Sequence, residues 1–199
     1  MTNNKFMLDC KLQLSCRNSG VAMMMKNKEM LDIFEECVSI VYNIIKDGGN
    51  VLLCGNGGSA AQAQHIAAEF VGRFRRDRRP LFAKALTADT SVLTAIANDY
   101  GYEHAFARQI ESLRRGPGIL IALSTSGCSP NILKAVDVAK TKGFITIGLT
   151  GEHGGDLKHT AQYWLGVPSN DTAVVQEMHL ILLHIMCNFI DEYLFGEEE

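Results

Sequence analysis

The amino-acid sequence predicts an α/β protein built on an open, parallel, five-stranded sheet with helices on both faces. Three observations support this prediction. Short, continuous apolar runs recur along the chain, as expected of strands buried on both faces. Segments with apolar residues at helical spacing separate these runs, and such alternation is typical of parallel sheets covered by helices. Glycine-rich and serine-rich loops follow two of the runs directly, at the strand ends where open α/β sheets bind ligands.

The chain begins with a segment unlike the rest. Residues 1–27 have Asn-rich and Met-rich patches without a clean period, and we predict an irregular N-terminal extension there. Residues 28–199 are predicted to form a single domain. Its first element is a helix over residues 27–47, which Gly48 and Gly49 end.

Strands and helices alternate from there to the end of the chain. The predicted strands span residues 51–54, 82–86, 118–123, 144–149 and 163–167. The predicted helices span residues 59–73, 90–97, 103–114, 131–142 and 172–194, the last being long and strongly apolar. No internal repeat or linker divides them.

Composition and charge narrow the function classes. The 199 residues are 47% hydrophobic and 21% charged, and the net charge of −3 predicts no nucleic-acid or membrane-surface partner. No fully apolar run reaches the roughly 18 to 20 residues that cross a bilayer, and the N-terminus lacks a signal-peptide pattern. Six scattered cysteines without a C-x-x-C pair suit a reducing compartment. We therefore expect a cytoplasmic protein.

The first loop of interest is Gly55-Asn56-Gly57-Gly58-Ser59, between a predicted strand and a predicted helix. Glycines allow positive φ and a close approach of ligand to backbone. Ser59 is placed to cap the helix or to donate to an anion at its positive end. The loop lacks the lysine of a Walker A motif. A tight turn without ligand explains it equally well.

The second loop, Ser124-Thr125-Ser126-Gly127-Cys128-Ser129, also joins a strand to a helix. Its four hydroxyls and its backbone N–H groups converge where the next helix presents its N-terminus. An N-cap accounts for one hydroxyl but not for four. We therefore predict a phosphate cradle that works by hydrogen bonds and the helix dipole.

Two helices carry candidates for proton transfer or metal binding. His65 and Glu69 are four residues apart and share a helix face, although a plain surface pair would look the same. Gln176 and His184 are eight apart on the last helix and point to broadly the same side. Together these four residues could form a zinc site with two imidazoles, a carboxylate and an amide oxygen. His179 is interpreted as a hydrogen-bonded core residue.

Taken together, these motifs resemble the phosphoheptose isomerases of the SIS (sugar isomerase) superfamily, from about residue 50 to residue 191. The shared motifs are Gly55-Asn-Gly-Gly-Ser59, His65-x-x-x-Glu69, Gly72-Arg73, Ala97-Asn-Asp99, Ser124-Thr-Ser-Gly-x-Ser129, Leu149-Thr-Gly151 and Gln176-Glu-x-His-x-x-x-x-His184. The resemblance implies an SIS-type, flavodoxin-like fold and a homotetramer with active sites at subunit interfaces. It also implies conversion of sedoheptulose 7-phosphate to D-glycero-D-manno-heptose 7-phosphate, the first step of nucleotide-activated heptose synthesis for lipopolysaccharide or other surface glycans.

The resemblance also implies roles for individual residues. Glu69 is expected to move a proton between C1 and C2 through an enediol, and His184 to handle protons on oxygen. One zinc per subunit would be held by His65, Glu69, Gln176 and His184. The expected substrate-binding residues are Asn56, Gly57, Gly58, Ser59, Arg73, Asn98, Asp99, Ser124, Thr125, Ser126, Ser129, Thr172 and Gln176. If Glu69 binds zinc, the same carboxylate must serve as ligand and base, and sequence leaves this open.

The sequence departs from the family pattern at Val174, where many relatives carry an arginine two residues before the helix glutamine. Thr172 or Asp171 could replace that polar contact. We expect the substitution to affect which sugar is bound more than which reaction is catalysed. Arginines also crowd the segment after residue 72. Of these, Arg73 matches the family, and we expect the others to be solvated: Arg75, Arg76, Arg78 and Arg79.

A second function class shares much of this pattern. Non-catalytic SIS proteins that bind the replication initiator DnaA resemble the segments Ala60–His65 and Leu93–Asp99. They lack the acid at the position of Glu69 and the histidine at the position of His184. Because this chain has both, we favour the enzyme.

Overall fold

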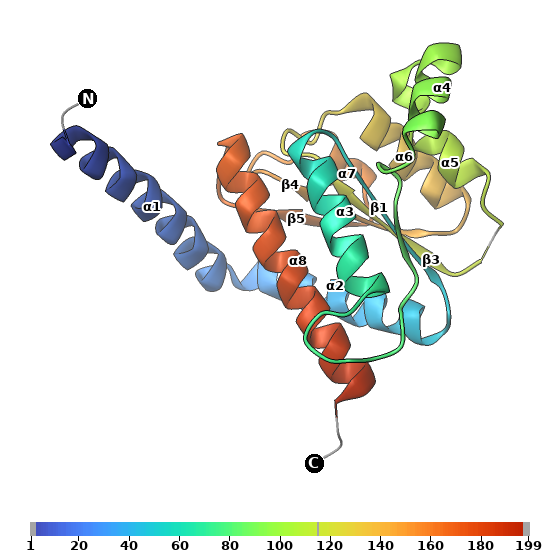
Figure 1. Cartoon of the computed structure of the whole chain (residues 1–199), viewed down its shortest axis with the longest axis horizontal. Coiled ribbons are helices and arrows are strands. Elements are labelled where there is room, and N and C mark those ends of the chain that lie inside the picture. The colour runs from blue at the N-terminus through green and yellow to red at the C-terminus, as the bar shows by residue number, and fades with distance from the viewer. Residues whose placement is uncertain (1–2, 115, 197–199) are drawn as a thin grey trace.

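The computed structural model describes residues 3–114 and 116–196. A five-stranded sheet of order β2-β1-β3-β4-β5, parallel throughout, forms its centre (Figure 1). The strands are β1 (Asn50–Gly55), β2 (Ala83–Ala85), β3 (Gly118–Leu123), β4 (Ile145–Thr150) and β5 (Tyr163–Gly166). The helices are α1 (Asn3–Lys26), α2 (Lys28–Lys46), α3 (Gly58–Val71), α4 (Thr90–Tyr100), the 3-10 helix η1 (Tyr102–His104), α5 (Ala107–Glu111), α6 (Pro130–Thr141), α7 (Leu157–Thr160) and α8 (Thr172–Phe195). The predicted fold class is confirmed.

The alternation of side chains along the strands creates two separate cores. In β1, Val51 and Leu53 pack into a core with α2, α3 and α8, whereas Leu52 and Cys54 pack on the other face against α5 and α6. Both sets are fully buried, because a central parallel strand is covered on both sides. The continuous apolar run in the sequence is the direct result.

The strand order places the two candidate loops side by side. From β1 the chain moves outward to β2, then returns to β3 on the opposite side of β1. The loops after β1 and β3 therefore diverge at a topological switch point, where doubly wound sheets open a crevice beyond their carboxyl ends. Both the glycine loop and the serine loop lie at this edge.

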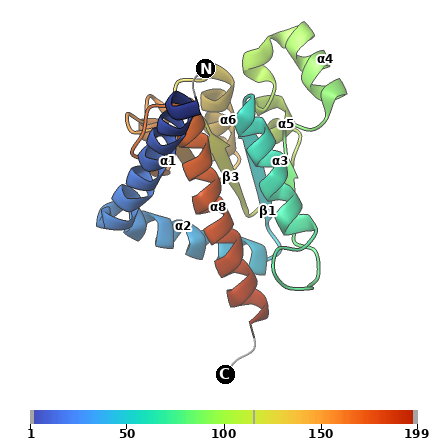
Figure 2. The same ribbon diagram turned by 60° about the vertical axis from the view of Figure 1, so that its left-hand side comes forward.

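The predicted irregular extension is wrong, because residues Asn3–Lys26 form the 24-residue helix α1. α1 projects from the body of the molecule and touches it mainly through its C-terminal half, near Gly20 and Met24 (Figures 1 and 2). A helix that packs over so short a stretch needs no continuous apolar face, so its sequence carries no helical period.

The region between β2 and β3 also differs from prediction. The expected helix over 103–114 is instead η1 followed by the short α5. Gly101, with a positive φ of 95°, ends α4 and precedes η1. α4 has no buried residue and stands away from the sheet at the top of Figure 1. The strand expected over 82–86 is reduced to β2, and the short α7 has no counterpart among the predicted elements.

α8 lies on the sheet face shared with α2 and α3. By length and composition alone it could cross a membrane, with a hydropathy of 1.5 over its most apolar window. Half of that window is buried inside the protein. Its apolar residues Val175, Met178, Leu182 and Met186 belong to the core, as expected of a core helix.

His179 on α8 is fully buried, as predicted for a core histidine. Its Nε2 donates to the carbonyl of Thr150 at 3.0 Å, whereas its Nδ1 has no partner in the described chain. Burial lowers the pKa of His179 to about 4, against the weaker raising effect of the Thr150 bond. The folded protein therefore favours the neutral ring.

We predict that this histidine makes folding sensitive to acid. Because its pKa is lower in the folded state than in the unfolded state, stability is lost as pH falls from about 6.5 to about 4. The loss amounts to about 3 kcal/mol. His179→Gln, which keeps a donor for Thr150, should flatten the pH dependence of unfolding free energy in this window. The exposed His153→Gln serves as control, and equal slopes in all three proteins would contradict the prediction.

Gly127 in the serine loop has a φ of 70°, and an added Cβ would lie 1.9 Å from the carbonyl oxygen of Gly154. Gly143 has a similar φ of 84° but open space around it. We predict that Gly143→Ala costs about 1–2 kcal/mol from backbone strain alone. Gly127→Ala should cost at least about 2 kcal/mol more, because backbone atoms must also move. Chemical denaturation measures both, and equal losses would show that the loop relaxes freely.

Candidate active site

The glycine loop and the serine loop enclose a cavity of about 300 Å³ at the switch point. Nine of the expected substrate-binding residues line it: Asn56, Gly57, Gly58, Ser59, Ser124, Thr125, Ser129, Thr172 and Gln176. Leu123 is the other lining residue. Ser126 lines a neighbouring cavity of about 240 Å³, which shares Thr125 and Thr172 with the first.

Two helix N-termini face this cavity without side-chain caps. The N-cap residue of α3, Gly57, has no side chain to cap the helix, and the side chain of the α6 N-cap residue, Ser129, makes no capping hydrogen bond. The hydroxyl of Ser129 instead lies 3.1 Å from that of Ser124, which also accepts a hydrogen bond from the backbone N–H of Gly127. Two positive helix ends and several hydroxyls therefore remain available to an anion.

A pair of asparagines links the glycine loop to the first turn of α6, which follows the serine loop. Asn56 and Asn131 exchange hydrogen bonds through their side-chain amides, at 2.9 and 2.8 Å. The hydroxyl of Tyr102 also donates to Asn56 Oδ1 at 3.0 Å. Asn131 and Tyr102 are not among the predicted site residues, because nothing in their spacing along the sequence indicates that they meet Asn56.

α3 and α8 lie side by side and pack closely at their first turns. The side-chain amide of Gln62 donates to the backbone carbonyl of Gln176. A Cβ at Gly58 would come within 2.4 Å of the Gln176 side-chain oxygen, so a larger residue there would push the end of the Gln176 side chain aside. The Gln176 side chain is thereby placed in the wall of the cavity.

Further along the same two helices, His65, Glu69 and His184 form a cluster. His65 Nε2 lies 3.0 Å from His184 Nε2 and 3.1 Å from Glu69 Oε1. One ligand atom from each residue lies within 4.8 Å of the others. The His65 side chain is 48% exposed and that of Glu69 is 23% exposed, so the cluster opens to the surface.

The surroundings of His184 favour its neutral form. Burial lowers its pKa, and the neighbouring His65 lowers it further against the opposing effect of Glu69. The ring of Phe74 stacks on His184, with centroids 5.7 Å apart and planes 18° apart. A neutral imidazole can accept a proton or bind a metal ion.

The donor set of this cluster suits a zinc ion. Two nitrogens bound to one tetrahedral Zn²⁺ lie roughly 3.3 Å apart, close to the 3.0 Å between the His65 and His184 nitrogens. The carboxylate of Glu69 supplies an anionic third donor. Gln176 is eight residues before His184, about 12 Å along the helix axis, and its side chain lines the cavity. The structure thus brings three of the four predicted metal ligands together.

Three expected substrate contacts lie outside the cavity of their own chain. Arg73 follows the C-terminal end of α3, whose 14 residues span about 21 Å from the cavity end. Asn98 and Asp99 lie exposed on α4, where the amide of Asn98 donates to Asp99 at 2.8 Å. None of the three lines the cavity.

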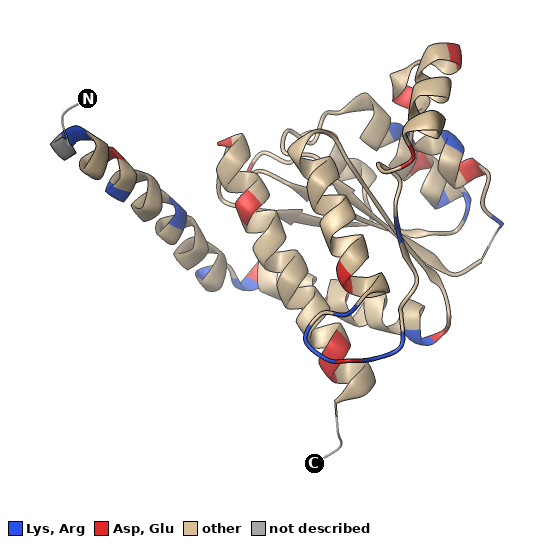
Figure 3. Cartoon of the chain, in the orientation of Figure 1, with Lys and Arg blue, Asp and Glu red and all other residues tan. Residues whose placement is uncertain are grey.

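The arginine-rich loop between α3 and β2 contradicts one prediction. This loop is densely basic (Figure 3), and Arg75, Arg76 and Arg79 are exposed as expected. Arg78, in contrast, has a side chain only 2% exposed that pairs with the equally buried Asp191 at 2.7 Å. Sequence offered no sign of this, because Asp191 is more than a hundred residues away.

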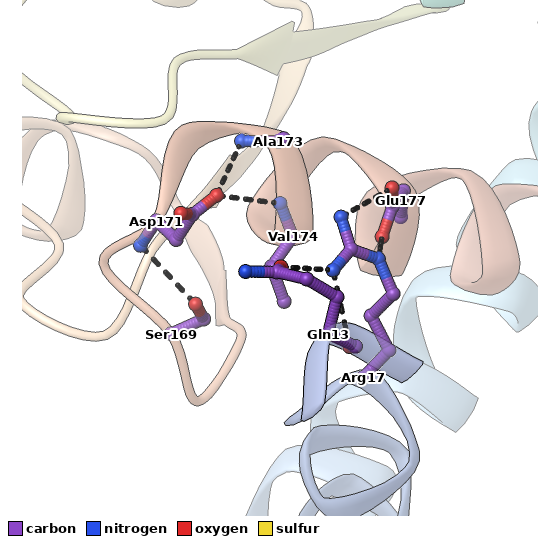
Figure 4. Close-up of polar contacts among 7 residues, drawn as sticks. All are labelled: Gln13, Arg17, Ser169, Asp171, Ala173, Val174 and Glu177. Carbon is purple, nitrogen blue, oxygen red and sulfur yellow. Dashed lines mark hydrogen bonds and ion pairs between the residues drawn. The ribbon is translucent and has the colours of Figure 1, made fainter. Parts of the chain in front are cut away.

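The start of α8 shows what surrounds Val174. The carboxylate of Asp171 caps α8 by accepting from the N–H groups of Ala173 and Val174 (Figure 4). Val174 is 3% exposed and belongs to the core. α1 crosses beside it, and Arg17 forms an ion pair of 2.6 Å with Glu177. Of the two proposed replacements for the missing arginine, Thr172 lines the cavity, whereas Asp171 is used as a cap.

Comparison with known proteins agrees with this geometry. The SIS domain family matches residues 20–151. A phosphoheptose isomerase of Burkholderia pseudomallei is 49% identical over 178 residues, 89% of this chain and 90% of that protein. One from Roseiflexus is 52% identical over 157 residues, 79% of this chain and 80% of that protein. The structure of phosphoheptose isomerase from Neisseria gonorrhoeae has a TM-score of 0.87 and 36% identity, covering 94% of this chain and 99% of that one. The chain belongs to the phosphoheptose isomerase family of SIS-domain proteins.

Proposed function

We propose that this protein is an aldose–ketose isomerase that converts sedoheptulose 7-phosphate to D-glycero-D-manno-heptose 7-phosphate. The observation that carries the proposal is the meeting of His65, Glu69 and His184 on the same two helices whose first turns line an anion-binding cavity. Relatives named phosphoheptose isomerase that match most of the chain support the same activity. The product would supply heptose for lipopolysaccharide or other surface glycans, in the cytoplasm.

The phosphate end of the substrate would lie in the cavity. The hydroxyls of Ser124, Thr125, Ser126 and Ser129 and the uncapped first turns of α3 and α6 would hold it. These donors are neutral, so they bind an anion without a fixed positive charge. The sugar would then extend along α3 toward Glu69, with Ser59 and Gln176 near its path.

The reacting end would lie at the cluster. Glu69 is the group that would take a proton from one carbon and return it to the neighbouring carbon, since a carboxylate beside C1 and C2 can serve both as base and as acid. His184, whose lowered pKa favours the neutral ring, would receive and return the proton on the substrate oxygens. Both residues lie on rigid helices rather than on loops.

We also propose that the cluster holds one zinc ion per subunit, with His65, Glu69 and His184 as ligands and Gln176 as a further candidate. When bound, zinc would supply positive charge that stabilises the developing enediolate oxygen. Two imidazoles and one carboxylate suit this ion by chemistry and spacing.

We also propose that the protein forms a homotetramer with active sites between subunits. The exposed apolar surface of α8 supports this proposal. Ile181, Ile185, Phe189 and Tyr193 recur every four residues and are 38%, 40%, 36% and 57% exposed. Such a ridge suits packing against another helix. A second subunit over this face would cover the half-exposed cluster. It would also explain why Arg73, Asn98 and Asp99 lie outside the cavity of their own chain.

The initiator-binding alternative would use the cavity without the cluster. A protein that only binds has no chemical need for Glu69 and His184 within reach of one another. Their contact through His65 therefore favours the enzyme over the binding module.

We predict that Glu69→Gln lowers turnover of sedoheptulose 7-phosphate by at least about 100-fold, the usual contribution of a general acid–base group. Binding should persist, because the phosphate cradle is intact; calorimetry with the substrate measures it. The exposed Glu111→Gln on α5 is the matched control and should keep full activity. Metal content is measured in parallel, since loss of turnover with metal retained separates the two roles of Glu69. Full activity in Glu69→Gln would refute the proposed mechanism.

We further predict that chelation removes one equivalent of zinc per subunit and lowers activity at least about 100-fold, as expected when charge stabilisation of an oxyanion is lost. Elemental analysis of the purified protein checks the stoichiometry, and added zinc should restore turnover. His65→Ala should lose the metal. Full activity at background zinc would contradict the metal proposal but not the isomerase proposal.

A further inference from the structure

The Arg78–Asp191 ion pair is buried and connects the loop after α3 to the helix α8. Arg78 Nε donates to Asp191 Oδ1 at 2.7 Å, and both side chains are 2% exposed. The other carboxylate oxygen of Asp191 accepts the backbone N–H of Arg75 at 3.1 Å. Both oxygens of this carboxylate are therefore bonded.

The same guanidinium also closes the C-terminal end of α3. Arg78 Nη2 donates to the carbonyl of Glu69 at 2.9 Å, and Nη1 donates to the carbonyl of Phe70 at 2.9 Å. These carbonyls belong to the last turn of the helix, where a cation is favoured. Arg78 thus binds the backbone of a cluster residue directly.

A second line of contacts leads from Asp191 to His184. Asp191 holds the N–H of Arg75, and the preceding residue, Phe74, stacks on the His184 ring. His184 itself lies two turns before Asp191 on α8. One buried ion pair therefore contacts the peptide of Glu69 on one side and supports the ring that packs on His184 on the other.

We infer that Arg78 and Asp191 are positioning residues that hold His65 and Glu69 on α3 in register with His184 on α8. The inference rests on the proposed function only for the role of the cluster. A buried ion pair adds little net stability over apolar residues of the same size, so stability alone does not account for it. Instead, the guanidinium of Arg78 donates hydrogen bonds to Asp191 and to two carbonyls at the end of α3, and this fixes the position of α3 relative to α8.

Asp191→Asn and Arg78→Lys test the inference from both sides. Asparagine keeps the shape but removes the charge of the carboxylate. Lysine keeps a charge, so the protein still folds, but it cannot reach Asp191 and both carbonyls together. Each change should weaken Co²⁺ binding by about 10-fold or more, the usual effect of outer-shell partners, and alter the visible spectrum of bound Co²⁺. kcat should fall with KM nearly unchanged, because the phosphate cradle lies at the opposite end of α3.

The matched control is Ile190→Ala. Ile190 is fully buried, adjacent to Asp191 in sequence and part of the core, so its truncation destabilises the protein without removing the ion pair. At equal loss of melting temperature, Ile190→Ala should leave the Co²⁺ spectrum unchanged. If it disturbs the spectrum as much as Asp191→Asn does, general loosening explains the effect and the inference fails.

A readout without metal or substrate separates this inference from the proposed function. In metal-free protein with labelled histidine rings, the NMR signals of His65 and His184 should shift in both variants. The signal of His179, buried on the same helix, should not. Unchanged His65 and His184 signals, with Co²⁺ affinity within twofold of the unaltered protein, would overturn the inference. If the unaltered protein neither binds Co²⁺ nor isomerises sugar, the proposed function fails while the ring signals still decide the positioning role.

Discussion

The packing of α3 against α8 is the interaction on which the candidate site depends. Both helices begin at the carboxyl edge of the sheet and run in the same direction over the same face (Figure 1). Their first turns meet where Gln176 approaches Gly58, and later turns meet where His184 approaches His65. Because a helix rises about 1.5 Å per residue, one helix–helix contact sets the distance between the anion cavity and the titratable cluster.

The two ends of the site use different electrostatics. The cavity offers hydroxyls and two helix ends without side-chain caps, so the groups proposed to hold an anion there are dipoles that do not titrate. The cluster relies on titratable side chains, and burial lowers the pKa of His184 there. In the proposed function, this separation would let the cavity hold a phosphate without a fixed cation beside the residues proposed to move protons.

Buried charge in the described chain is placed where partners surround it. Arg78 and Asp191 are desolvated together and satisfy each other and the end of α3. His179 avoids the cost of a buried charge by remaining neutral. The titratable groups of the cluster are instead partly exposed, next to the apolar ridge of α8. A site of this kind gains its low-dielectric surroundings only when another surface covers it.

Local periodicity and short spacing were enough to predict the sheet, the positions of the glycine and serine loops, and the placement of His65 with Glu69 and of Gln176 with His184 on single helices. The Asn56–Asn131 link, the buried Arg78–Asp191 pair and the contact between His65 and His184 arise from the tertiary structure. These contacts join residues 75 or more positions apart, and no local pattern encodes which of many polar residues will meet. α1 escaped prediction for a related reason: its short contact with α2 and α8, rather than an amphipathic period, places it on the protein.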